Sequence, residues 1–177
     1  HKIVDCRGSN AAASPWWSYL PFGLTKGEVL TIKSEQLEMD RTFNAGFFLL
    51  PLGNDYFKIG ATFNWKDKSL LPTEEGKQEL KKKFEQYFSV DYEILDHKAG
   101  IRPTVQDRRP LIGNHPAISN LSLFNGLGTK GVMLAPYLSN LFIESFITNK
   151  PLRSDMDIKR FEKYWGEEAP QINYPNP

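Results

Sequence analysis

One arginine and one glycine-rich turn are the residues of this sequence whose types and spacing best suit the binding of an anion. Arg102 follows an apparent strand over residues 92–101, and residues 126–131 read Gly-Leu-Gly-Thr-Lys-Gly before an apolar segment that has no Gly or Pro after Pro136. A guanidinium can hold a carboxylate through two hydrogen bonds, and a helix start offers N–H groups and the positive end of the helix dipole. The pattern predicts a site for an anionic or electron-rich ligand. The alternative is that Arg102 is a surface ion-pair partner and the glycines only shape a turn.

Composition limits the classes of function. The chain has 177 residues, enough for one ordinary domain, or a domain and a half, with a buried core. Its 22 basic and 21 acidic residues give a net charge of +1, which does not support binding to nucleic acid or to a membrane surface. The single cysteine, Cys6, excludes an internal disulfide framework and a cysteine zinc site, and the three histidines are scattered. We therefore expect no metal site.

The sequence shows no targeting segment and begins abruptly. No apolar run approaches the ~18–20 residues of a transmembrane helix, and no signal peptide is visible. We expect no membrane span, and a reducing cytoplasm is the default location. The chain starts without Met, and residues 2–8 read as a buried strand that reaches a turn. This start predicts that the chain is a piece of a longer protein.

Hydrophobic patterning predicts the secondary structure. Thr73 is a good N-cap, and the apolar residues from Leu80 to Phe88 follow at helical spacing. A second helix is expected after the glycine-rich turn, and a short terminal helix near Phe161. Residues 15–19 read as an aromatic loop. Strands are expected at residues 3–6, 27–33, 43–50, 56–63, 92–101, 110–113 and 121–124. Together these elements predict an α+β fold, a mixed or largely antiparallel sheet with packed helices.

No constellation of nucleophile and base stands out. The serines lack an elbow motif, and Cys6 is more typical of a small core residue than of a reactive thiol. Trp16, Trp17 and Trp65 lie in loop-like contexts, without the basic cluster of an RNA-binding surface. Hydride or electron transfer fits better, because a cofactor then carries the chemistry and the protein only orients and tunes it.

The assembled motifs resemble the C-terminal half of the D-amino acid oxidase, glycine oxidase and sarcosine oxidase family of flavoenzymes. The resemblance runs in order over roughly residues 3–151. Each block alone is weak, but five blocks in register are a strong signal. The matching blocks are residues 3–8, 21–30, 48–53 with 59–62, 99–103 with 107 and 110–113, and 126–136.

The resemblance implies a role for the arginine and for the turn. Arg102 aligns with the arginine of the family's Gly-x-Arg-Pro segment and would bind a substrate carboxylate. The glycine-rich turn would lie against FAD, where its N–H groups and the helix start stabilise negative charge on the reduced ring. Lys130, where the family varies, would contact flavin, substrate or only solvent. No catalytic side chain is implied, because no base is needed if the amine reacts in its neutral form. The implied FAD-binding residues are Gly8, Gly128, Thr129, Lys130, Gly131 and Val132.

Two departures from the family pattern shape the expectation. The Gly-x-Gly-x-x-Gly fingerprint of a dinucleotide site is absent, so this piece alone should bind FAD poorly or not at all and should need the missing N-terminal FAD-binding half as its partner. Phe63-Asn64 replaces the acidic residue that usually follows Gly-Ala-Thr, which leaves the type of substrate open.

The leading hypothesis is a fragment of an FAD-dependent oxidoreductase that oxidises the C–N bond of an amino acid or secondary amine by hydride transfer to flavin. The alternative is a non-catalytic α+β binding module, or a degenerate family member. The leading hypothesis predicts that Arg102 and residues 128–131 converge. The expected domains are a remnant of the FAD-binding domain with a connecting loop (1–24), a substrate-binding domain (25–112), the strands, flavin-facing loop and C-terminal helix of the FAD-binding domain (113–165), and a loose tail (166–177).

Overall fold

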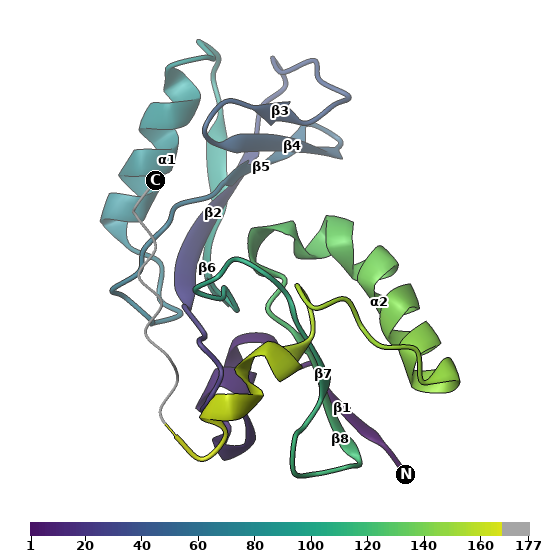
Figure 1. Cartoon of the computed structure of the whole chain (residues 1–177). Coiled ribbons are helices and arrows are strands. Elements are labelled where there is room, and N and C mark those ends of the chain that lie inside the picture. The colour runs from purple at the N-terminus through teal and green to yellow at the C-terminus, as the bar shows by residue number, and fades with distance from the viewer. Residues whose placement is uncertain (168–177) are drawn as a thin grey trace. The chain divides into compact units, whose positions relative to one another are not determined.

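The chain forms two compact units, each with its own sheet. The computed structural model describes residues 1–167. The first unit combines His1–Leu24 with the described residues from Arg102 onward, and the second is Thr25–Ile101. Strands with packed helices, in mostly antiparallel sheets, confirm the predicted α+β fold (Figure 1). The predicted loose tail falls almost wholly on residues 168–177, outside the described residues.

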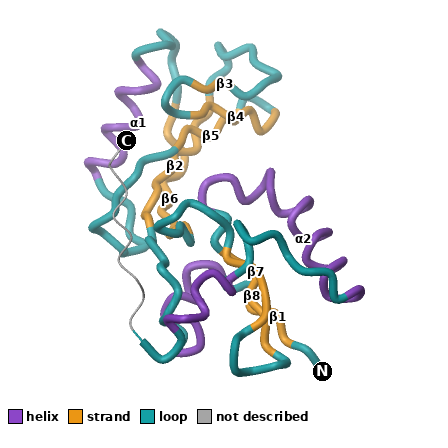
Figure 2. The backbone as a smooth tube through the Cα atoms, viewed as in Figure 1, coloured by secondary structure: helices purple, strands orange, loops and turns teal. Residues whose placement is uncertain are grey.

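The sheet of the first unit joins the start of the chain to its second half. Its strands are ordered β1 (Ile3–Asp5), β8 (Leu121–Asn125) and β7 (Leu111–Asn114). β1 runs parallel to β8 and β7 runs antiparallel to it; Figure 2 shows the three strands side by side. Because a parallel pair needs a crossover connection, the pairing of β1 with β8 depends on all the chain between them.

Two apolar clusters build the core of the first unit. Helix α2 (Gly131–Thr148) packs Leu138 and Phe142 into one cluster with Ile112 of β7. The other cluster contains Trp17, Tyr19 and the 3₁₀ helix η4 (Ile158–Tyr164). The expected aromatic loop contains the short 3₁₀ helix η2 (Pro15–Trp17), in which Trp17 is fully buried and its Nε1 donates to Asp5 Oδ2 at 2.9 Å.

The second unit is a five-stranded sheet with one helix packed on it. Its core includes Leu80 and Phe84 of helix α1 (Glu74–Glu85), which are fully buried together with Leu30 and Ile59 of the sheet. These two helix residues are four apart, so the predicted apolar face is confirmed. The strand order is β3 (Phe43–Asn44), β4 (Phe48–Gly53), β5 (Tyr56–Gly60), β2 (Thr25–Lys33) and β6 (Glu93–Arg102).

The single strand predicted at residues 43–50 is wrong. Gly46 has a φ of 73°, a conformation that suits glycine and reverses the chain, so the segment splits into β3 and β4, which pair antiparallel. β4 also continues past residue 50, the predicted end of the strand, as far as Gly53. Pro51 lies beyond Leu49, the last residue of β4 that β3 pairs with, so β4 is an edge strand at that point, where proline is tolerated.

A buried polar network fixes the start of α1. Thr73 is the N-cap, and its Oγ1 accepts a hydrogen bond from Gly76 N at 3.0 Å, which confirms the predicted cap. Glu28 of β2 is 3% exposed and accepts from both Thr73 N and Thr73 Oγ1 at 2.9 Å. Lys26 Nζ, also buried, lies 3.5 Å from Glu28 Oε1 and donates to Asp67.

His97 completes this network from the neighbouring strand β6. Its Nε2 lies 2.8 Å from Glu28 Oε2. The ring nitrogen is not aligned for a hydrogen bond with any described residue. The contact is therefore electrostatic, and it is attractive when the ring is protonated.

Candidate functional site

Arg102 is half-buried where strand β6 ends and the first unit resumes. Its burial lowers the pKa of the guanidinium, but a guanidinium starts so high that it stays charged at neutral pH. Its carbonyl accepts a hydrogen bond from Thr104 N at 2.8 Å, which turns the chain directly after the strand. A half-buried cation in such a turn differs from an ordinary surface lysine or arginine, which keeps its charge in bulk water.

The glycine-rich turn starts at a position that only glycine fits. Gly126 follows β8 with a φ of 73°, and a Cβ there would lie 2.7 Å from Val105 Cγ2 and 2.8 Å from Leu111 N. A side chain at this position would clash with these atoms, and a positive φ is a conformation that suits glycine. The turn is therefore held tightly against the segments on either side of it.

Asn125 ties the turn to Gly8, and it was not singled out from the sequence. Its side chain is 3% exposed, its Nδ2 donates to Gly8 O at 2.9 Å, and its Oδ1 accepts from Gly126 N at 2.8 Å. The structure thus brings Gly8 to the base of the glycine-rich turn. A signal was present in the sequence, an asparagine at the end of an apolar strand directly before a glycine, where such side chains often bond nearby backbone groups.

Gly128 brings the turn to the arginine segment. It opens the 3₁₀ helix η3 (Gly128–Lys130) with a φ of 55°, and a Cβ on it would lie 3.7 Å from Thr104 Cγ2. Thr104 is two residues after Arg102. The glycine-rich turn therefore lies near the arginine segment within the first unit.

Helix α2 begins without a side-chain cap and without an acidic residue in its first turn. The residue before it is Lys130. Val132 in that turn is 97% exposed within the described residues, and Thr129 and Lys130 are exposed as well. A helix start of this kind leaves N–H groups and the positive end of the dipole available to a ligand.

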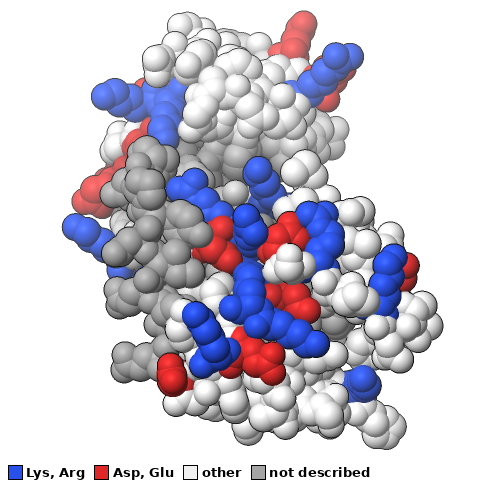
Figure 3. All heavy atoms as spheres, viewed as in Figure 1, with Lys and Arg blue, Asp and Glu red and all other residues white. Residues whose placement is uncertain are grey.

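These residues can bind and orient, but they supply little acid–base chemistry. Within residues 1–167, no group of three or more His, Cys, Asp or Glu side chains could hold a metal ion. None of the described helices is long and apolar enough to cross a membrane. On the face shown in Figure 3, acidic and basic side chains are interleaved.

The glycine-rich turn and the first residues of α2, which we call the flavin cradle, leave room for a flat ring. Gly128 and Gly131 keep the backbone bare at the turn, since a Cβ on either would meet only ordinary contacts at 3.5 Å or more. Bare backbone next to an uncapped helix start is what close approach by a flat, electron-rich ring requires. The residues present therefore fit FAD.

Curated proteins include relatives that match most of this chain in sequence. The chain is 28% identical over 141 residues to glycine oxidase from Bacillus subtilis (strain 168), an alignment that covers 78% of this chain and 37% of the relative. It is 26% identical over 156 residues to glycine oxidase from Pseudomonas aeruginosa, covering 85% of this chain and 43% of the relative. The chain thus spans less than half the length of these relatives.

Solved structures share the fold. Iminodiacetate oxidase from Chelativorans sp. BNC1 superposes with a TM-score of 0.75 at 20% identity, over 88% of this chain and 45% of that one. L-Proline dehydrogenase from P. horikoshii gives a TM-score of 0.75 at 19% identity, over 95% and 48%. A family model described as FAD dependent oxidoreductase (DAO) matches residues 1–145. The chain therefore belongs to the DAO family of FAD-dependent oxidoreductases, as its motifs indicated.

Proposed function

We propose that this chain is part of an enzyme that oxidises the C–N bond of an amino acid or secondary amine by transferring a hydride to FAD. The relatives support this substrate class by their names. Glycine, iminodiacetate and L-proline each carry an amine and a carboxylate. Glycine oxidase is similar to this chain in sequence, and iminodiacetate oxidase and L-proline dehydrogenase share its fold. The electron acceptor that reoxidises the flavin is not part of the proposal.

Arg102 is the proposed anchor for the substrate carboxylate. The observation that carries the proposal is that a Cβ on Gly128 would lie 3.7 Å from Thr104 Cγ2, two residues after Arg102, so the arginine segment lies near the proposed flavin loop. A half-buried guanidinium binds a carboxylate more strongly than an exposed one, since less water competes. A carboxylate held there would orient the neighbouring C–H bond toward the flavin. Lys130, exposed at the end of η3, is a second candidate contact for substrate or flavin.

The glycine-rich turn and the start of α2 are the proposed flavin contacts. FAD, when bound, supplies the hydride acceptor. The chain's own part is to stabilise the negative charge that the ring gains, through the N–H groups of residues 128–132 and the helix dipole. Gly8, held by Asn125 at the base of the turn, would position the backbone near the rest of the cofactor. No side-chain base is proposed, because a neutral amine needs none.

The remaining part of the enzyme is proposed to cover a surface of the first unit. β1 is an outer strand of its sheet, and its Ile3 and Val4 are exposed. Helix α2 also exposes apolar side chains along its length, and such surface marks an interface; they include Val132, Met133, Ile143 and Ile147. We propose that an N-terminal FAD-binding half covers this surface, and that residues 1–177 alone bind FAD poorly. A cytoplasmic location is proposed from the single cysteine.

The test is anaerobic bleaching of the flavin in the full-length protein. Glycine, N-methylglycine and L-proline would each be added, with pyrrolidine as the analogue of proline that lacks the carboxylate. We expect a yellow protein that one of the amino acids bleaches, beside a colourless fragment of residues 1–177. Full-length protein that is colourless and takes up no added FAD would favour the binding module or the degenerate relative.

The Arg102→Met variant tests the anchor itself. Removing one partner of a desolvated charge pair costs about 2–5 kcal/mol, so kcat/KM for the active amino acid should fall at least about thirtyfold, while any activity toward an amine without a carboxylate stays unchanged. Arg41→Met is the matched control, because the Arg41 side chain is 90% exposed in the second unit. An equal loss for both kinds of substrate would remove Arg102 from the carboxylate site.

A further inference from the structure

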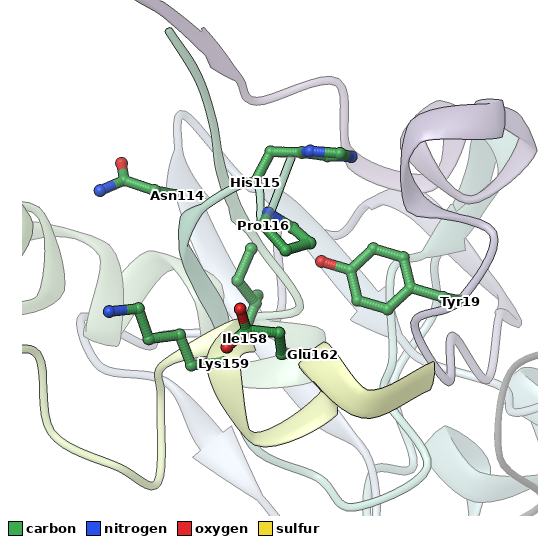
Figure 4. A pocket seen from close by; sticks show the side chains of 7 residues that line it. All are labelled: Tyr19, Asn114, His115, Pro116, Ile158, Lys159 and Glu162. Atoms are coloured by element: carbon green, nitrogen blue, oxygen red, sulfur yellow. The ribbon is translucent and has the colours of Figure 1, made fainter. Parts of the chain in front are cut away.

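The first unit contains a cavity that the proposed reaction does not use. It has a volume of about 300 Å³, at the lower end of the range for small-molecule sites. Its walls come from three places in the chain, as Figure 4 shows: Tyr19, residues His115 and Pro116 after β7, and Ile158 and Glu162 of η4. None of these residues belongs to the glycine-rich turn or the arginine segment.

The Tyr19 hydroxyl is the feature that points to a ligand. The side chain is 1% exposed, and the hydroxyl has no hydrogen-bond partner among the residues that the structure describes. In Figure 4 the hydroxyl oxygen is aimed into the space between Pro116 and Glu162. Buried hydroxyl groups in native proteins almost always have a partner, because leaving one unpaired is costly. A molecule in the cavity would supply that partner.

The charges around the hydroxyl favour a cation. Burial raises the pKa of Tyr19, and the carboxylates of Glu162 and Asp157 raise it further, so the phenol stays protonated and sits in a negative potential. Lys159 also lines the cavity, but its ammonium lies on the side away from Tyr19 in Figure 4. A positive group beside the hydroxyl would therefore be attracted by the surrounding charge.

His115 does not supply this positive charge. Its Nδ1 accepts hydrogen bonds from Ala117 N at 3.1 Å and Ile118 N at 3.0 Å, so the ring proton of the neutral form is on Nε2. Burial lowers the pKa of the ring, only partly offset by the Trp16 carbonyl. The imidazole is therefore neutral at physiological pH and acts as part of the wall.

We propose that this cavity binds a small organic cation that carries a primary ammonium group on a short alkyl chain. The ammonium would donate hydrogen bonds to the Glu162 carboxylate and to the Tyr19 hydroxyl oxygen. The alkyl part would lie against Pro116 and Ile158, which supply apolar walls. This site is separate from the proposed substrate site and does not depend on flavin.

The test is isothermal titration calorimetry of the protein with butylammonium chloride. Its neutral and anionic analogues, 1-butanol and sodium butyrate, are the probes for specificity. We expect butylammonium to bind and the other two to give no binding heat. Loss of a hydrogen bond to a charged group predicts an affinity about tenfold lower in Glu162→Gln, and a smaller reduction in Tyr19→Phe. Tyr137→Phe and Glu35→Gln, at exposed positions outside the cavity, should leave the affinity unchanged.

Two results would overturn the proposal. Equal binding of butyrate or 1-butanol would show that the cavity does not select a cation. Butylammonium binding that is the same in wild type and in both cavity variants would place the cation elsewhere. Because Glu162 is exposed, its variant tests the proposal even if Tyr19→Phe fails to fold. Since binding is measured without flavin, the outcome is independent of the proposed oxidase activity.

Discussion

The two α-helices of this chain begin in opposite ways. Helix α1 in the second unit starts with a capping threonine, two acidic residues in its first turn and the buried Glu28 carboxylate hydrogen-bonded to the cap. Helix α2 in the first unit starts with Lys130, which makes no cap hydrogen bond, and has no acid in its first turn. The same backbone groups and the same dipole are present in both helices. Among the described residues, only the first has a side-chain cap.

We propose that this difference separates a structural helix start from one that serves a ligand. At α1 a carboxylate of the protein occupies the place that an anion would take, and Gly76 leaves room for it: a Cβ there would lie 2.5 Å from Glu28 Oε2. At α2 the corresponding place has bare glycine backbone and an exposed Val132. In a family of FAD-dependent enzymes, we interpret the second start as incomplete without its cofactor.

The largest effect is expected from Glu28→Ala. The substitution leaves buried Lys26 with a lost counter-charge and Thr73 N without its acceptor, so the free energy of unfolding should fall by about 3–5 kcal/mol. Urea unfolding followed by circular dichroism measures the loss. Glu35→Ala is the control, since its side chain is 77% exposed, and surface changes usually stay within about 0.5 kcal/mol. A loss as small as the control's would make Glu28 dispensable to the start of α1.

The same carboxylate should make stability depend on acid pH. Burial opposes its ionisation, but hydrogen bonds from Thr73 and the charges of Lys26 and His97 outweigh this and lower the pKa of Glu28 below its ordinary 4.5. Asp67, hydrogen-bonded by Lys26, has its pKa lowered to about 2. For a lowered pKa, the stabilisation is complete above the unfolded-state value and is lost as pH falls through the folded-state value. Stability should therefore drop below about pH 4.5.

Glu28→Gln separates this contribution from general acid unfolding. Between neutral pH and about pH 3 its urea midpoint should change less than that of wild type, because the glutamine cannot gain a proton. The variant should be less stable than wild type at neutral pH, with the difference narrowing in acid. Parallel curves for the two proteins would assign the acid sensitivity to other groups, such as Asp5, whose pKa is lowered chiefly by its hydrogen bond from the Arg7 side chain.

Sequence reasoning recovered what depends on neighbouring residues. The Thr73 cap, the apolar face at Leu80 and Phe84, and the glycine-rich turn before α2 are local patterns, and the structure contains each of them. The family followed from short motifs in the right order. The prediction that Arg102 and residues 128–131 converge came from that resemblance, because no local pattern links residues that far apart.

The missed features depend on distant residues or on a single backbone angle. Glu28 lies in an alternating strand that gives no sign of burial, and its partners Thr73 and His97 are far along the chain. Asn125 was passed over because its acceptor, Gly8 O, is at the other end of the sequence. The reversal at Gly46 interrupts a run of apolar residues that otherwise fits one strand.

The smallest and sharpest test is a pair of glycine-to-alanine substitutions, one at each helix start. Gly76→Ala puts a Cβ 2.5 Å from Glu28 Oε2 and 2.6 Å from its Cδ, so repacking should cost about 1–3 kcal/mol and exceed the ~1 kcal/mol that alanine gains in a helix. Gly131→Ala puts a Cβ 3.5 Å from Leu127 Cβ, with φ −55° and ψ −47°. It should therefore fold as well as wild type or up to about 1 kcal/mol better.

The two variants should also differ in what they do to the cofactor. Because Gly131 is part of the proposed flavin cradle, Gly131→Ala should weaken FAD binding to the full-length protein while its unfolding free energy is unchanged or raised. Gly76→Ala should show the reverse, lower stability with unchanged FAD affinity. Unfolding in urea and a flavin fluorescence titration measure the two quantities separately. If Gly131→Ala left FAD affinity intact, the bare backbone at α2 would serve the fold alone, and the two helix starts would differ only in how much of their capping the chain provides.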